Sequence, residues 1–153
     1  MSSHTILLVE DNEDDVFLMK RALRAAGIEN PLQIAEDGQV AIDYLAGTGE
    51  HADRLRSPLP MIVFLDLKLP YKSGHEVLEW IRQQPHLETL IVIVLTSSNE
   101  TVDLDLAYKL GANSFVVKPP TATLLQKMTE SFKLWWLNHN RANPIEPSIK
   151  AAD

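Results

Sequence analysis

The chain has 153 residues, of which 45% are hydrophobic and 23% are charged, and its 14 Lys and Arg residues against 21 Asp and Glu residues give a net charge of −7. This composition is typical of a globular domain and excludes collagen-like and disordered classes, while the absence of cysteine excludes disulfides, thiolate metal sites and a cysteine nucleophile. The negative charge and the scattered basic residues also argue against binding to nucleic acid.

No apolar segment approaches the roughly 20 residues that a membrane-spanning helix needs. The longest apolar runs lie at 60–65 and 90–95. The N-terminal residues show no basic segment followed by an apolar region, so no signal peptide is predicted. We therefore expect a cytoplasmic protein without a membrane partner.

Short apolar runs alternate with amphipathic segments along the chain. Consecutive apolar residues indicate a strand that is buried on both faces, and apolar residues three or four apart indicate one face of a helix. In chain order, this pattern predicts a strand at 6–9, a helix at 16–26, a strand at 32–35, a helix at 40–45, a strand at 61–65, a helix at 74–84, a strand at 90–95, a helix at 100–110, a strand at 114–117 and a helix at 124–135.

Two stretches lack this periodicity. Residues 47–60 are polar and contain glycine and proline, which predicts a surface loop longer than most connections between a helix and a strand. Residues 139–153 are also polar and aperiodic, which predicts a flexible C-terminal tail. We therefore expect one folded domain over residues 1–138 and no second domain.

The alternation of buried strands with helices is typical of an α/β fold with a parallel sheet that helices cover on both faces. Five such units favour an open, doubly wound five-stranded sheet, because a closed barrel needs eight units and roughly 250 residues. Ligands of open sheets bind outside the carboxyl ends of the strands. The residues that follow the predicted strands are therefore the first candidates for a functional site.

Acidic, hydroxyl and lysine side chains follow four of the predicted strands. They are Glu10 and Asp11 after the first strand, Asp66 after the third, Thr96 at the end of the fourth and Lys118 after the fifth. Carboxylates that converge on one edge repel one another, and a bound hard cation such as Mg²⁺ relieves that repulsion. We interpret Asp14 and Asp15 instead as solvated charges at the start of a helix.

This set of residues suits phosphoryl transfer. One carboxylate can act as the nucleophile and take up a phosphoryl group as an acyl phosphate, while a metal and a lysine neutralise charge on the phosphoryl oxygens. Asp66 is the central candidate for the nucleophile, because it stands alone at its strand end. Glu10 and Asp11 form an adjacent pair better suited to holding the metal, and Lys118 supplies the ammonium group.

Several segments, taken together in order, resemble the receiver domain of two-component response regulators. They are residues 6–12 (ILLVEDN), 64–70 (FLDLKLP), 73–76 (SGHE), 94–97 (VLTS) and 107–119 (AYKLGANSFVVKP). The resemblance extends from about residue 4 to residue 137 and implies a flavodoxin-like (βα)5 fold. Residues 1–138 would then form a receiver, or response regulatory, domain.

This resemblance implies a role for each residue at the predicted sheet edge. Asp66 would accept the phosphoryl group from a sensor histidine kinase or a phosphotransfer protein, and Lys118 would pair with the phosphoryl oxygens. Mg²⁺ would be held by Glu10, Asp11, Asp66 and the backbone carbonyl of Lys68. The protein would then be a phospho-acceptor that assists its own phosphorylation and dephosphorylation, and not an enzyme that turns over a separate substrate.

The resemblance also implies a conformational switch. Thr96 would turn its hydroxyl toward the phosphoryl group, and Phe115, where many family members have tyrosine, would move inward behind it. Phosphorylation would thereby change the protein-interaction surface around the fourth helix and the fifth strand. A cis peptide bond is expected between Lys118 and Pro119, and Pro120 would fit the first turn of the last helix.

Three features are similar to small regulators that partner phytochrome-type histidine kinases: the long loop before residue 61, the DLKLP segment at 66–70 and the tryptophan-containing end of the last helix. Trp135 and Trp136 cannot face the same core, because adjacent residues of a helix point about 100° apart. One of them is therefore a candidate for a homodimer or partner surface, with packing at the helix end as the alternative. Phe132 is expected to pack on the sheet.

Two other classes of protein fit parts of the pattern. A phosphohydrolase with an aspartyl nucleophile uses the same acyl-phosphate chemistry, but such enzymes typically carry Asp-x-Asp after the first strand. A flavodoxin-like cofactor-binding module shares the sheet, but its phosphate-binding loop should be rich in Gly, Ser and Thr, where this chain has Glu-Asp-Asn-Glu-Asp-Asp. Turnover of phosphate esters would favour the first class, and the acidic residues repel the anionic cofactors of the second.

Overall fold

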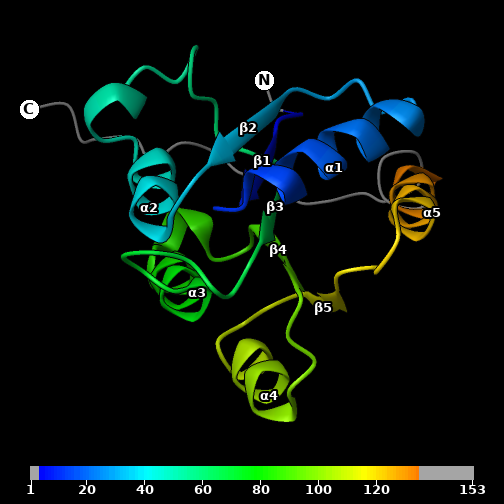
Figure 1. The fold of residues 1–153 in the computed structure, drawn as a ribbon. Helices are drawn as coiled ribbons and strands as arrows, with labels where there is room; N and C mark the ends of the chain where they lie inside the picture. The colour runs from blue at the N-terminus through cyan, green and yellow to red at the C-terminus, as the bar shows by residue number, and fades with distance from the viewer. Residues whose placement is uncertain (1–3, 135–153) are drawn as a thin grey trace, which may run out of the picture.

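Five parallel strands form one sheet in the computed structural model, which describes residues 4–134 (Figure 1). The strands are β1 (Ile6–Val9), β2 (Leu32–Ala35), β3 (Ile62–Leu65), β4 (Ile91–Thr96) and β5 (Ser114–Val117). Their order across the sheet is β2-β1-β3-β4-β5, which confirms the flavodoxin-like, doubly wound fold that the sequence predicts. This order places the turning point of the topology between β1 and β3, where ligands of such sheets bind.

Helices cover both faces of the sheet. They are α1 (Glu13–Ala25), α2 (Gly38–Ala46), α3 (Gly74–Gln83), α4 (Thr101–Lys109) and α5 (Ala122–Phe132), with short 3-10 turns η1 (Gly49–His51) and η2 (Pro85–Leu87). The first and last helices pack together on one face, and α2 and α3 pack together on the other, with α4 next to α3 and β5 (Figure 1). Each observed element agrees with its predicted range to within a few residues at each end.

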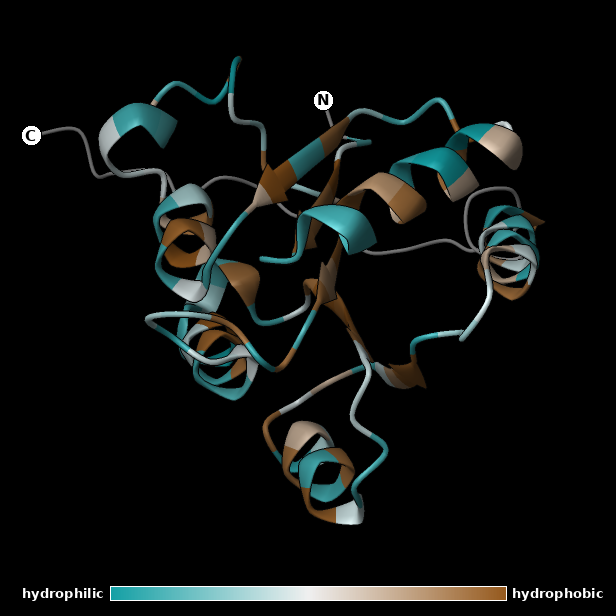
Figure 2. Cartoon of the chain, in the orientation of Figure 1, coloured by the Kyte–Doolittle hydropathy of each residue, from teal (hydrophilic) through white to brown (hydrophobic). Residues whose placement is uncertain are grey.

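The core explains why the strands read as continuous apolar runs. Alternate side chains of a strand point to opposite faces, so Leu7 and Val63 pack beneath α2 and α3, whereas Leu8 and Phe64 pack beneath α1 and α5. All four residues of β1 and all four of β3 are buried. Figure 2 shows the same contrast: hydrophobic residues dominate the central strands, and the helices carry both hydrophobic and hydrophilic residues.

The long loop between α2 and β3 has a fixed structure. The guanidinium group of Arg54 donates hydrogen bonds to the carbonyl oxygens of Tyr44 at 2.6 Å, Leu45 at 2.8 Å and Ser57 at 3.1 Å. The hydroxyl of Tyr44 donates to the carbonyl of Pro58 at 2.6 Å. Carbonyl groups in the last turn of a helix lack the regular helical hydrogen bonds, and Arg54 donates from the loop to two of them, those of Tyr44 and Leu45.

The structure corrects two predictions near the last helix. The described residues contain no cis peptide bond, so the predicted cis bond between Lys118 and Pro119 is wrong and this bond is trans, the form that an X-Pro bond favours by default. The helix begins at Ala122, because the side chain of Thr121 accepts the backbone N–H of Leu124 and caps it. Pro120 therefore precedes the helix and does not occupy its first turn.

The predictions for the C-terminal region divide into two groups. Phe132 packs on the sheet side of α5 as predicted, with its ring centroid 5.3 Å from that of Phe64 in an edge-to-face arrangement. Trp135, Trp136 and the predicted tail at 139–153 lie outside the described residues. Across residues 4–134, no helix combines the length and the apolar character needed to cross a bilayer.

Candidate functional site

Three strand ends bring an ammonium group and carboxylates into direct contact. Glu10 follows β1, Asp66 follows β3 and Lys118 follows β5, so that all three lie at the carboxyl edge of the sheet. The Nζ atom of Lys118 lies 2.7 Å from Oε2 of Glu10 and 3.3 Å from Oδ2 of Asp66. The structure therefore brings together residues that are 108 and 52 positions apart in the sequence.

Burial makes the electrostatic balance of this group important. The side chains of Glu10 and Asp66 are 3% and 9% exposed, and that of Lys118 is 18% exposed. Burial raises the pKa of Glu10, and the hydrogen bond from Lys118 opposes that rise. Burial by itself would lower the pKa of Lys118, but its hydrogen bonds to carboxylates and their charges outweigh burial and hold that pKa above its ordinary value. Lys118 therefore stays a cation beside the acids.

The backbone after β3 fixes the position of the Asp66 carboxylate. Its Oδ1 atom accepts a hydrogen bond of 2.7 Å from the backbone N–H of Leu67, and the carbonyl of Leu67 accepts the N–H of Gly74 at 2.9 Å. A Cβ atom at residue 74 would collide with the backbone carbonyl of Asp66, so the loop can close this tightly only with glycine there. The loop itself turns at Tyr71, which has a positive φ of 65° and an exposed ring.

A divalent cation fits the acidic part of this site. Glu10, Asp11 and Asp66 each offer a carboxylate oxygen, and these oxygens lie within 4.8 Å of one another. Carboxylate oxygens are the ligands that hard divalent cations prefer. Asp11 is exposed whereas the other two are buried, and the depression above them also contains Lys68, so the cluster is open to solvent on one side.

Thr96 lies in β4 and Phe115 in β5, the strand that Lys118 follows. Thr96 ends β4 with its side chain fully buried, and its hydroxyl oxygen accepts the N–H of Ser98 at 3.3 Å. The carbonyl of Thr96 accepts the backbone N–H of Lys118 at 2.7 Å. Phe115 is half-buried in β5, and its N–H donates to the hydroxyl of Tyr108 at 3.1 Å. These contacts do not test the switch role of Thr96 and Phe115, which stays a prediction.

Asp15 belongs to the site although the sequence did not predict this. We interpreted it as a solvated charge, but its Oδ2 atom lies 2.8 Å from Nζ of Lys118. It occupies the first turn of α1, one turn before the buried Met19. Residues four apart lie on the same side of a helix, so the apolar spacing of α1 contained a signal that Asp15 faces inward and that Asp14 does not.

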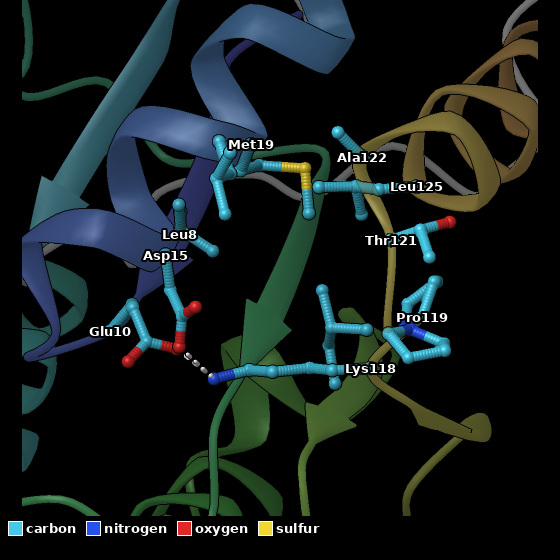
Figure 3. A pocket seen from close by; sticks show the side chains of 12 residues that line it. Leu8, Glu10, Asp15, Met19, Lys118, Pro119, Thr121, Ala122 and Leu125 are labelled. Carbon is cyan, nitrogen blue, oxygen red and sulfur yellow. Dashed lines mark hydrogen bonds and ion pairs between the residues drawn. The ribbon is translucent and has the colours of Figure 1, made fainter.

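A small apolar cavity adjoins the charged cluster. It has a volume of about 90 Å³ and lies between α1 and the segment from Lys118 to Leu125. Figure 3 shows the carboxylates of Glu10 and Asp15 converging on the Lys118 ammonium at one end, with Met19 and Leu125 at the apolar end. The site therefore combines a charged centre with an apolar wall.

Comparison with known proteins identifies the same kind of domain. A family model described as the response regulator receiver domain matches residues 6–130. The probable methanogenesis regulatory protein FilR2 of Methanothrix harundinacea is 40% identical over 137 residues, which cover 90% of this chain and 86% of that protein. Response regulator Rcp1 of Synechocystis is 38% identical over 132 residues, which cover 86% of this chain and 88% of that protein.

Solved structures agree with this similarity. The Mn²⁺-bound form of Rcp1 aligns with a TM-score of 0.82 and 36% identity, covering 92% of this chain and 99% of that chain. The phosphorylated cyanobacterial phytochrome response regulator RcpA aligns with a TM-score of 0.84 and 31% identity, with the same coverage of 92% and 99%. One of these relatives is thus known with a divalent cation and the other in a phosphorylated form.

Proposed function

This chain belongs to the response regulator receiver family, and we propose that Asp66 is the residue on which it accepts its phosphoryl group. The chain is a phospho-acceptor of two-component signalling, as its relatives are. The observation that carries the assignment of Asp66 is its contact with Lys118 beside Glu10, at the central strand end of the sheet. The phosphohydrolase and the cofactor-binding module receive no support from the family match.

The chemistry follows from these contacts. An oxygen of the Asp66 carboxylate attacks the phosphorus atom, and an oxygen–phosphorus bond forms as the bond from phosphorus to the donor nitrogen breaks. The donor imidazole leaves with the bonding electron pair and takes up a proton. The ammonium of Lys118, 3.3 Å from Asp66 Oδ2, neutralises charge on the transferred group, and the N–H of Leu67 orients the other oxygen.

We assign Mg²⁺ as the divalent cation of this site. The carboxylates of Glu10, Asp11 and Asp66 and the backbone carbonyl of Lys68 would hold it. Mg²⁺ favours one or two carboxylates together with water and phosphate oxygens, which an open acidic cluster next to a phosphoryl group provides. When bound, this cation supplies positive charge against the phosphoryl oxygens.

The output of phosphorylation is a changed protein surface. We assign Thr96 as the hydroxyl that moves toward the phosphoryl group and Phe115 as the aromatic residue that moves with it. Support comes from their place in the sheet, because Thr96 and Val117 are paired across β4 and β5 and Lys118 follows directly. A change at the site thus has a short route through the backbone to α4 and β5.

Receiver domains exchange phosphoryl groups with histidine kinases and phosphotransfer proteins. The likeness to RcpA, a phytochrome response regulator, supports a phytochrome-type kinase as the donor here. We further propose that residues 1–138 form the receiver domain with 139–153 as its tail, and that the protein acts in the cytoplasm. We also propose that it binds no nucleic acid and turns over no separate substrate. A second copy of the chain is a candidate partner, with which it would form a homodimer.

Intact-mass spectrometry tests the central assignment. Wild type is incubated with phosphoramidate in Mg²⁺ and in EDTA, alongside Asp66→Asn and the exposed control Asp105→Asn. We expect one base-labile phosphoryl adduct that requires Mg²⁺, is present in the control and is absent from Asp66→Asn. An adduct of wild-type yield on Asp66→Asn would falsify the assignment.

A further inference from the structure

Lys118 has more carboxylate partners than the proposed transfer step uses. Its ammonium has three N–H donors, and three carboxylates take them: Glu10 at 2.7 Å, Asp15 at 2.8 Å and Asp66 at 3.3 Å. We propose that Asp15 is a positioning residue for phosphotransfer, which holds the Lys118 ammonium at Asp66 from the side of α1. This inference rests on the proposed function and concerns a residue to which that function gave no role.

Two of the three carboxylates that contact Lys118 could also hold a cation, and the third could not. Glu10 and Asp66 also belong to the set of carboxylates that can hold a divalent cation, whereas Asp15 does not. A cation held by that set would compete with Lys118 for the carboxylates of Glu10 and Asp66, because lone pairs that face a metal are less available to an ammonium. Asp15 is therefore the carboxylate partner that Lys118 can keep when the site is loaded.

The backbone of α1 holds Asp15 in place for this role. Its N–H donates to the side chain of Asn12 at 3.0 Å in the helix cap, and the buried Met19 one turn later fixes the inward face of the helix. The side chain of Asp15 is 38% exposed, so its charge is only partly solvated. Asp14, the preceding residue in the same turn, is exposed.

A lysine needs such a partner more than an arginine does. Its ammonium is a point charge on a flexible four-carbon stem, so its direction depends on the groups that accept its hydrogen bonds. Without Asp15, the stem loses its contact on the α1 side and the ammonium samples positions away from Asp66. Hydrogen bonds to charged groups are strong enough that losing one should slow a step that depends on it by about tenfold.

The test compares Asp15→Asn with Asp14→Asn, which removes the same charge from the same helical turn without touching Lys118. Rates of phosphorylation by phosphoramidate are measured at saturating Mg²⁺ by intact mass. We expect Asp15→Asn to be about tenfold slower than Asp14→Asn. Asp15→Glu, which keeps the carboxylate, should recover part of the rate. Equal rates in Asp15→Asn and Asp14→Asn would overturn the proposal.

A double-mutant cycle tests whether Asp15 acts through Lys118. Adding Asp15→Asn to Lys118→Ala should change the remaining rate no more than adding Asp14→Asn does, since the contact is already gone. A further tenfold loss in the Lys118→Ala background would overturn the proposal. Calorimetric titration with Mn²⁺ gives a second readout: because Asp15 is not a ligand, Asp15→Asn and Asp14→Asn should weaken cation binding equally.

The failure of this inference and the failure of the proposed function give different results. If wild type forms no adduct, or forms it on a residue other than Asp66, the proposed function is wrong and the inference with it. If wild type forms the Asp66 adduct and Asp15→Asn behaves as Asp14→Asn does, only the role of Asp15 is wrong. Thermal unfolding of each variant confirms that the rates compare folded proteins.

Discussion

Lys118 follows the end of β5 and Arg54 lies in the loop between α2 and β3, and each cationic group donates hydrogen bonds to several oxygen atoms. The partners of Arg54 are neutral backbone carbonyls at the end of α2 and in the following loop, whereas those of Lys118 are carboxylates from three elements. Burial lowers the pKa of Arg54, while the surrounding carboxylates hold the pKa of Lys118 above its ordinary value.

This difference in partners indicates that the contacts of Arg54 serve the structure, whereas those of Lys118 serve the function. Backbone carbonyls carry no net charge and do not belong to the proposed cation or phosphoryl site, so we expect the contacts of Arg54 not to change with the state of that site. The carboxylates around Lys118 can instead be claimed by a cation or by a phosphoryl group, so their contacts change with the state of the site. The predictions below test whether the two clusters differ in this way.

The largest effect is expected from Lys118→Ala. This change leaves Glu10 and Asp66 buried without their counter-charge, and breaking a buried ion pair from one side costs about 3 kcal/mol of unfolding free energy. Mg²⁺ should restore more stability to this variant than to wild type. We also expect some remaining phosphorylation that no longer produces the conformational change.

Urea unfolding with Mg²⁺ and with EDTA measures the stability difference, and Lys118→Met is the control that keeps an apolar stem. Lys118→Met should match Lys118→Ala in its response to Mg²⁺, because both lack the charge. A response to Mg²⁺ equal to that of wild type would show that the charge of Lys118 does not balance the acids.

A smaller effect is expected from Arg54→Ala, which removes hydrogen bonds to three carbonyls. We expect a loss of about 2 kcal/mol in unfolding free energy and no change in the rate of phosphorylation. Arg54→Lys should recover little of the stability, because an ammonium cannot reproduce the planar fork of a guanidinium. Urea unfolding and the phosphoramidate assay measure the two quantities. A slower rate of phosphorylation in Arg54→Ala would contradict the separation of the two clusters.

The smallest effect at neutral pH is expected from Tyr44→Phe. Removing the hydroxyl that donates to Pro58 should cost about 1 kcal/mol. Burial raises the pKa of Tyr44 to about 12, although the charge of Arg54 opposes this, and the ordinary value in an unfolded chain is about 10. The folded state therefore keeps the proton between these values, and wild type loses stability as pH rises through that window.

Phenylalanine has no hydroxyl proton to lose, so only wild type loses stability in this way. The difference in unfolding free energy between wild type and Tyr44→Phe should therefore become smaller from pH 10 upward. Urea unfolding at a series of pH values between 7 and 11 measures this gap. A gap that stays constant over the series would mean that the Tyr44 hydroxyl titrates alike in the folded and unfolded chains.

The fold could be predicted from the sequence because its main determinants are local. Apolar runs such as that of β1 and Gly at the helix ends set the elements, and strict alternation sets the parallel sheet. The carboxyl ends of parallel strands lie at one edge of the sheet, so the meeting of Glu10, Asp66 and Lys118 there could also be predicted, whereas the order of the strands comes from the structure. These three could be named because each follows a strand directly.

The missed features depend on side-chain direction and reach. Asp15 was misjudged because a run of acids looks uniform in sequence, and only the helical phase relative to Met19 shows which of them faces inward. The fixed loop after α2 was read as polar surface, because nothing in the composition shows that Arg54 reaches back to a helix end. The bond between Lys118 and Pro119 is trans, although the resemblance to the family led us to expect a cis bond, so the family resemblance alone did not predict the form of this bond.

The backbone hydrogen bond from Lys118 to Thr96 makes this one amide a reporter of motion. β5 is one of the two edge strands of the sheet and pairs only with β4, so it can separate from β4 while the rest of the sheet stays closed. The Lys118 amide exchanges its hydrogen with solvent when that separation occurs. Deuterium exchange at this position therefore counts the openings of the sheet edge that carries both the lysine and the threonine of the site.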